Sequence, residues 1–100
     1  MPYQKIFTAM ADSTRREVLE KLKGKPRTVA DIAADMPVSR PAVSQHLKVL
    51  EEAGLVSARA EGTRRFYTIN RDGIELLRKY LDGFWDDVMA NYAANILKKR

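Results

Sequence analysis

The chain contains no cysteine and a single histidine among its 100 residues. Without cysteine it can form no disulfide, no thiolate metal site and no thiol redox sensor. The lone histidine, His46, has no second His or Cys to complete a zinc site, and no Ser or Cys nucleophile with an orienting acid accompanies it. No glycine-rich phosphate-binding loop is present either. The sequence therefore predicts no catalytic residues, no metal site and no cofactor.

Long apolar runs are absent as well. No stretch of about eighteen apolar residues occurs, so we expect no insertion into a membrane. The N-terminal segment MPYQKIFTAMADSTRRE lacks the continuous apolar core and the cleavage site of a signal peptide, which predicts a cytoplasmic protein. A chain of this length fits one domain, residues 1–100, and is too short for a catalytic cleft with several walls.

What the chain does have is an excess of basic residues, with a net charge of +5 and a pI of about 9.7. Such a balance favours a polyanionic partner, nucleic acid first and an acidic membrane surface second. The charge is unevenly distributed. Residues 39–71 hold six basic and three acidic side chains, whereas residues 72–97 hold two basic and five acidic ones. Only the first of these segments suits contact with phosphate groups.

Two helices are predicted before residue 24. The first, residues 3–10, has an apolar face, and the second begins after a cap at Asp12 or Ser13 and runs to about Lys23. Arg15 and Arg16 fall in the first turn of the second helix, where positive charge opposes the helix dipole. We expect either that a carboxylate or a phosphate compensates them, or that they are solvated or paired with a nearby acidic side chain.

A helix-turn-helix is predicted for residues 28–53. Thr28 and Asp31 form a capping-box pattern ahead of a short helix that Pro37 must end. The helix that follows is expected over residues 39–53, with Ser39 as its N-cap and Gly54 as its stop. Its buried stripe is Val43, Leu47 and Leu50. A short helix, a tight turn and a longer amphipathic helix are typical of this motif.

The outward face of the 39–53 helix is polar and free of acidic residues over its N-terminal half. Gln and Arg side chains suit the edges of adenine and guanine in the major groove. We therefore assign base-edge contacts to Arg40, Ala42, Ser44 and Gln45, the shape of the entry turn to Pro41, and phosphate contacts to Ser39, His46 and Lys48. For His46, a role as a boundary residue satisfied within the fold is an equal alternative.

A two-stranded hairpin is predicted next, with strands over residues 55–60 and 64–69 and a turn at 61–63. Arg59, Arg64 and Arg65 crowd its tip and would repel one another without a counter-charge. Phosphates or a narrow minor groove would supply that charge, so beside a helix-turn-helix we interpret the hairpin as a DNA-contacting wing. The alternative is a solvated surface loop.

The last predicted helix runs from Arg71 to about Leu97, capped by Asn70. It carries a stripe of large apolar side chains that a monomer of this size could hardly bury, so we expect a partner subunit to cover it. The stripe residues assigned to this interface are Leu77, Leu81, Phe84, Trp85, Val88, Met89 and Tyr92. An effector could occupy the stripe instead. The acidic residues Asp82, Asp86 and Asp87 are read as a solvated face, with a hard-cation site as the less common alternative.

Residues 7–85 resemble the ArsR-type winged-helix repressors of bacteria. The stretches ADSTRREVLEKL, TVADIAADM, VSRPAVSQHLKVLEEAGLV and EGTRRFYTI carry the resemblance, and the third is the most specific. The resemblance implies a mainly α fold with a small two-stranded β-wing, a winged helix-turn-helix. It also implies a homodimer formed by the first and last helices, which adds Tyr3, Ile6, Phe7 and Met10 to the interface residues.

The function that the resemblance implies is repression of a promoter, often that of the repressor's own operon. The 39–53 helix would enter the major groove of an operator, and the 59–65 wing would lie near the backbone or the minor groove. Metal-sensing members use cysteines, or His and carboxylate ligands along the last helix, and this chain lacks both cysteine and a histidine there. It is similar to the metal-independent branch, with an unknown effector or protein partner. The alternatives are a metal- or small-ligand-responsive repressor with a non-cysteine site and a winged-helix module that binds protein.

Overall fold

A computed structural model describes the backbone of residues 2–98 and the side chains of residues 3–96. Five helices and one antiparallel pair of strands make up this part of the chain, which confirms the predicted winged helix-turn-helix. In chain order the elements are α1 (Pro2–Met10), α2 (Ser13–Glu20), α3 (Val29–Ala34), α4 (Arg40–Glu52), β1 (Val56–Glu61), β2 (Arg64–Ile69) and α5 (Arg71–Lys98).

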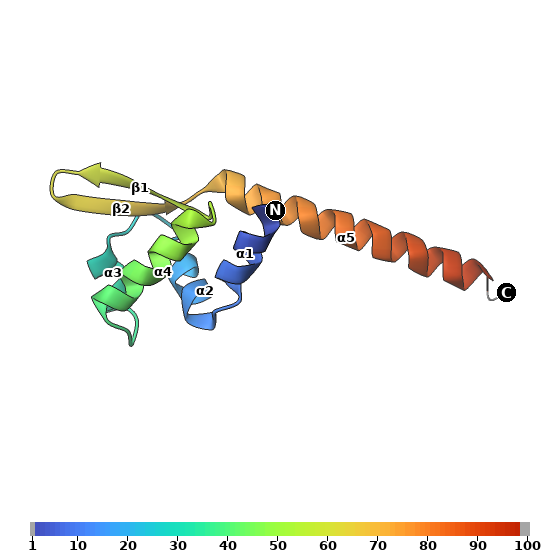
Figure 1. Ribbon diagram of the computed structural model, residues 1–100, viewed down its shortest axis with the longest axis horizontal. Coiled ribbons are helices and arrows are strands. Elements are labelled where there is room, and N and C mark those ends of the chain that lie inside the picture. Colours follow the sequence, from blue (N-terminus) through green and yellow to red (C-terminus); the bar gives the residue numbers. More distant parts are fainter. Residues whose placement is uncertain (1, 99–100) are drawn as a thin grey trace.

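Helix α5 leaves the rest of the molecule and projects into solvent (Figure 1). The described chain measures 66 × 25 × 24 Å, and its radius of gyration is 17.7 Å. A compact chain of this length would have a radius of gyration of about 13 Å. The difference arises because only the first part of α5 packs on the body formed by α1–α4 and the strands. None of the described helices is long and apolar enough to cross a membrane.

The core is centred on α4, whose stripe of Val43, Leu47 and Leu50 is fully buried, as its spacing predicts. The fully buried side chains that pack around it come from every element before β2, and they include Ile6, Val18, Ile32, Leu55 and Val56. One expectation is wrong here. Ile6 was assigned to the dimer interface, yet only 1% of it is exposed, so its side chain belongs to the core of its own protomer.

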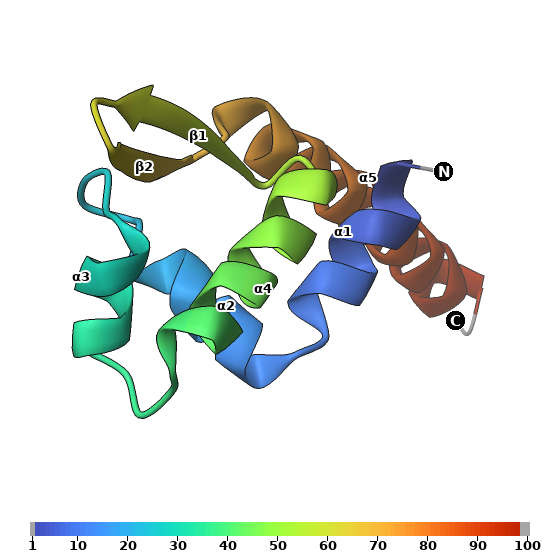
Figure 2. The ribbon, with the colours of Figure 1, turned by 60° about the vertical axis from the view of Figure 1, so that its left-hand side comes forward.

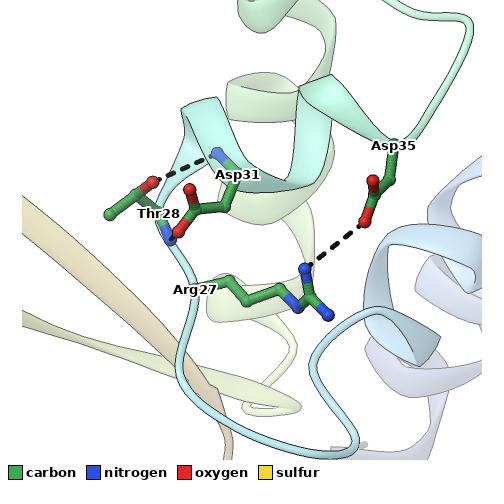
Figure 3. A network of polar contacts seen from close by, with 4 residues as sticks. All are labelled: Arg27, Thr28, Asp31 and Asp35. Atoms are coloured by element: carbon green, nitrogen blue, oxygen red, sulfur yellow. Dashed lines mark hydrogen bonds and ion pairs between the residues drawn. The ribbon is translucent and has the colours of Figure 1, made fainter.

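The predicted helix caps are confirmed. Asp12 accepts from the backbone N–H of Arg15 at 2.9 Å, and Ser39 accepts from that of Ala42 at 3.3 Å. Asn70 accepts from the backbone N–H of Asp72 at 3.1 Å at the start of α5. The capping box of Thr28 and Asp31 forms with both of its hydrogen bonds (Figure 3). These short-range bonds satisfy backbone donors that a helix cannot pair internally.

Two boundaries differ from the predicted ones for local reasons. Helix α2 ends at Glu20 rather than near Lys23, because the next residues tighten into bonds between residues three apart. Strand β1 starts one residue late, because the N–H of Leu55 returns to the carbonyl of Leu50 at 2.9 Å and completes the end of α4. With Gly54 at a φ of 79°, this is a Schellman motif.

The compensation of Arg15 and Arg16 also differs from the prediction. Their guanidinium groups donate to main-chain carbonyls in the last turn of α1, not to a carboxylate or a phosphate. Helix α1 has no basic residue of its own at that end. Cations stabilise the negative end of a helix dipole, so α2 supplies the charge that α1 lacks.

Arg27, which lies just before α3, attaches the wing to the body of the molecule. Arg27 and Tyr67 exchange backbone hydrogen bonds of 3.0 and 2.8 Å, which adds a one-residue third strand beside β2. The Arg27 side chain then reaches Asp35 at the end of α3, with Nη1 3.4 Å from Oδ2 (Figure 3). A two-stranded ribbon is marginal by itself, so these contacts hold the wing against the helix-turn-helix.

Helix α5 starts where two glycines meet. A Cβ atom added at Gly73 would overlap the carbonyl group of Gly54, so no larger residue fits there without a shift of the backbone. Just before this point the N–H of Asn70 donates to the carbonyl of Leu55 at 2.9 Å. The start of α5 is therefore held directly against the end of α4.

We predict that Gly73→Ala destabilises the protein by roughly 1–3 kcal/mol, because the added methyl group overpacks a backbone contact. The matched control is Gly83→Ala, since nothing lies within 4 Å of a Cβ added at Gly83. There the better helix propensity of alanine should stabilise by up to about 1 kcal/mol. Urea denaturation at one fixed protomer concentration measures both changes. Equal effects of the two substitutions would contradict the contact.

A second prediction concerns acid stability. The hydrogen bond from the backbone N–H of Arg15 lowers the pKa of Asp12, and the charges of Arg15 and His46 act in the same direction. A lowered carboxyl pKa in the folded state gives stability that is present above the unfolded-state value and is lost as the pH falls through the folded-state value. Asp12→Asn keeps an acceptor at the cap but cannot titrate. As the pH is lowered below about 4, the free energy of unfolding, measured by urea denaturation at each pH, should therefore fall less for Asp12→Asn than for the wild type. An equal fall for the two proteins would exclude this role of Asp12.

Candidate nucleic-acid interface

The outward face of α4 is open to solvent. Arg40, Ser44, Gln45 and Lys48 are exposed along it, and Pro41 is exposed in its first turn. Ala42 is partly buried. Figure 2 shows α4 crossing the front of the molecule, uncovered by the wing or by α5. A helix with one face in the core and the other free has the geometry that insertion into a major groove requires.

Two residues assigned to this surface also have structural tasks. The Ser39 hydroxyl oxygen accepts from the backbone of Ala42, which leaves its proton free to donate outward. His46 is partly buried, and its Nδ1 is shielded from water without a hydrogen-bond partner among the described residues. His46 lies close enough to Asp12 at the start of α2 that a positive charge on the ring would lower the pKa of that carboxyl. The ring therefore lies at the boundary between α4 and α2 rather than fully on the outward face.

The wing arginines are compensated to different degrees. Arg59 donates to Oε2 of Glu61 from Nε at 3.1 Å and from Nη2 at 2.6 Å. Arg65 lies 3.6 Å from a carboxylate oxygen of Glu51. Arg64 is exposed and has no ion-pair partner within residues 3–96. Carboxylates of the same chain thus supply the expected counter-charge for two of the three arginines, and contact of the three with phosphate stays a prediction.

A cleft of about 350 Å³ separates the end of the wing from the start of α3. In Figure 1 the wing's turn and α3 lie at the same end of the molecule, away from the tip of α5. Sequence reasoning missed this cleft, because its two walls are far apart in the chain and no local pattern marks them. The lining residues are Thr28, Val29, Ala30, Asp31, Thr63, Arg64 and Arg65.

The acidic residues of α5 do not gather into a cation site. Asp82 pairs with Arg78 at 3.4 Å, and Arg78 also reaches Glu75 at 3.5 Å, all within one helix. Over the part of the chain that the structure describes, no three His, Asp or Glu side chains come together in a way that could hold a metal ion. These carboxylates form a solvated face of α5.

Helix α5 exposes a long apolar surface, which we call the α5 stripe. Trp85 and Tyr92 are each 62% exposed and Phe84 is 60% exposed. At the body, Tyr80 packs against Tyr3 and Phe7 of α1, with ring centroids 5.0 Å apart in both pairs. Sequence reasoning missed Tyr80, although it lies one turn before Phe84. The α5 stripe consists of Leu81, Phe84, Trp85, Val88, Met89, Tyr92 and Ile96.

Of the remaining residues assigned to the dimer interface, some lie in the aromatic cluster around Tyr80 and others pack against the core. Phe7 is 38% exposed beside Tyr80 and extends the apolar surface from α5 onto α1. Tyr3 is partly buried in the same cluster. Met10 and Leu77 are partly buried against the core of their own protomer, so they offer less surface to a second chain.

Comparison with known proteins gives consistent matches. Residues 12–58 match the family described as bacterial regulatory protein, arsR family. The HTH-type transcriptional regulator Rv2034 of Mycobacterium tuberculosis is 49% identical over 89 residues, which cover 89% of this chain and 83% of the relative. The transcriptional repressor SdpR of Bacillus subtilis is 38% identical over 65 residues, which cover 65% of this chain and 72% of SdpR.

A solved structure shares the architecture. It is the homodimeric winged helix-turn-helix DNA-binding domain of Mb0332 from Mycobacterium bovis, to which this chain is 28% identical with a TM-score of 0.70. The match covers 88% of this chain and 82% of that one. The predicted resemblance is thereby confirmed, and the chain belongs to the arsR family of bacterial regulatory proteins.

Proposed function

We propose that this chain is a homodimeric, sequence-specific DNA-binding repressor that acts at its own promoter. Its relatives are transcription regulators rather than enzymes, and SdpR is a repressor. The observation that carries the proposal is the exposed outward face of α4 with Arg40 and Gln45, flanked by a wing whose Arg64 has no ion-pair partner among the described residues. In a DNA duplex, phosphates line both sides of the groove that α4 would enter, so an arginine without an ion-pair partner beside that helix can contact them.

The roles divide by side-chain chemistry. Arg40 and Gln45 can form two-point contacts with guanine and adenine edges, and Ala42 and Ser44 are short enough to let the helix approach the bases. Ser39, His46 and Lys48 on α4, with Arg59, Arg64 and Arg65 on the wing, contact phosphate oxygens. Arg59 and Arg65 must exchange a carboxylate for a phosphate to do so, whereas Arg64 need not.

The second copy of the chain covers the α5 stripe together with Phe7. A continuous set of large apolar side chains, each at least 38% exposed, costs free energy in water. Aromatic residues and Met are enriched in protein interfaces, and the homodimeric Mb0332 domain is a dimer of the same fold. That the protein works without a metal ion stays a prediction, which metal analysis of the purified protein addresses.

The direct test is binding of the purified protein to its own upstream DNA at two salt concentrations, with scrambled DNA as competitor. Binding that resists the competitor and weakens steeply with salt supports a repressor of its own operon. If scrambled DNA abolishes the binding, the protein has only the general affinity of a basic surface for DNA. In that case, enrichment of duplexes from a random pool separates a distant operator from a module that binds protein.

We predict different losses for two DNA-contacting residues. Gln45→Ala should change which base is preferred at one position, by roughly 1–3 kcal/mol for a two-point contact. Arg64→Ala should weaken binding to all sequences alike and reduce the salt slope by about one. Titration of operator and scrambled duplexes over several salt concentrations measures both. A loss for Gln45→Ala that is the same on every sequence contradicts its assigned role.

We also predict that Trp85→Glu yields monomers with much weaker operator binding, because a charge cannot be buried in an apolar interface without a partner. Ala90→Glu is the control, since it adds the same charge to an exposed position on the opposite side of α5. Sedimentation velocity gives the oligomeric state of both. If Trp85→Glu still sediments as a dimer, the α5 stripe is not the interface.

A further inference from the structure

The end of α1 is held by the two arginines that begin α2. Arg15 donates from Nε to the carbonyl of Ala9 at 2.7 Å and from Nη2 to that of Thr8 at 3.2 Å. Arg16 donates from Nη1 to the carbonyl of Met10 at 2.6 Å. The last three carbonyls of α1 each therefore receive a guanidinium N–H. A helix end leaves such carbonyls short of internal partners; of the three, that of Thr8 also accepts from the backbone N–H of Ala11, at 3.3 Å.

The two elements joined in this way belong to different parts of the proposed function. Helix α1 carries Phe7 and Tyr3 beside Tyr80, on the side where the second copy packs. Helix α2 packs on α4, and its cap Asp12 lies within reach of the charge of His46 on α4. The joint between α1 and α2 thus lies between the dimer surface and the helix that reads DNA.

Core packing and the contacts of Tyr3 and Phe7 with Tyr80 also hold α1 in place. Ile6 and Ala9 bury their side chains in the core, and burial of apolar surface has no preferred direction. A guanidinium is a planar fork with fixed donor directions, and Arg15 spans two successive carbonyls with it. Rotation of α1 against α2 would break these bonds.

We infer that Arg15 and Arg16 are positioning residues that set the angle between α1, with the part of the dimer surface that it carries, and the helix-turn-helix. Together with the glycine contact that directs α5, they thereby determine the separation of the two α4 helices, and with it the spacing of operator half-sites that the dimer accepts. This inference rests on the proposed function. In a twofold-symmetric dimer the half-sites are one helical turn apart or a multiple of it, so a tilt in each protomer changes the accepted spacing.

The test uses duplexes enriched from a random pool by the full wild-type chain. From the enriched sequence we would make a set in which the half-sites are moved apart or together by one and two base pairs, and one duplex with a single half-site. Each base pair rotates one half-site by about 34° around the duplex axis, so a rigid dimer discriminates strongly. Wild-type protein should lose roughly tenfold or more in affinity per inserted base pair.

Arg15→Ala and Arg16→Ala should lose this preference, so that each variant binds the duplexes of different half-site spacing with more similar affinities. Their binding to the single half-site and their sedimentation as dimers should match the wild type. Arg15→Lys keeps the charge at the end of α1 but cannot span two carbonyls, so it should restore stability without restoring the spacing preference. Lys23→Ala is the control, because Lys23 is exposed, lies outside the surfaces proposed for DNA and for the second copy, and is 4.0 Å from the carboxylate of the nearby Glu20.

The outcomes separate the inference from the proposed function. Wild-type protein that enriches no sequence overturns the proposed function, and the inference falls with it. Wild-type protein that discriminates between spacings, beside Arg15 and Arg16 variants that discriminate equally, overturns the inference alone. Should Arg15→Ala fail to fold, Arg16→Ala decides, since Arg16 is exposed and makes a single contact.

Discussion

The architecture depends on the contact between Gly73 and the carbonyl group of Gly54. Gly54 ends α4 in a left-handed conformation, which turns the chain into β1. The bare Cα of Gly73 then allows the first turn of α5 to lie on that end. Neither position tolerates a side chain easily, because one needs a positive φ and the other needs space. The direction of α5 is consequently fixed by the same residues that end α4.

The positive charge of the wing is partly neutralised within the chain. The wing has three arginines, yet Glu61 and Glu51 already neutralise two of them. Exposed ion pairs of this kind contribute about 0–1 kcal/mol, so a phosphate can replace the carboxylate at little cost. The same carboxylates lower the affinity for any passing polyanion. In the proposed complex the wing would therefore attract DNA less strongly than its arginine content alone indicates, and α4 would supply more of the sequence discrimination.

The features that the sequence predicts correctly depend on near neighbours in the chain. Caps at Asp12, Ser39 and Asn70 and the buried stripe of α4 follow from residues one or two turns apart. Periodicity did not distinguish Ile6 from Phe7, since both lie on the apolar side of α1, and only tertiary packing shows that one is buried in the core and the other is not. The partners of Arg15 and the bridge between Arg27 and Tyr67 are likewise products of the fold. The base and phosphate contacts stay predictions, because they concern a second molecule.

The chain also contains an intrinsic fluorescent probe. Trp85 is the only tryptophan, and it is 62% exposed in the middle of the α5 stripe. The emission maximum of an indole ring moves to shorter wavelength when the ring is shielded from water. The emission maximum of the unmodified protein therefore reports whether the face of α5 that carries Trp85 is exposed or covered by another molecule. For the proposed dimer, dilution of the protein in a cuvette would thus give the association constant of the subunits without a dye, a tag or DNA. The four tyrosines, which emit at shorter wavelength, are silent when excitation is confined to the red edge of the indole band.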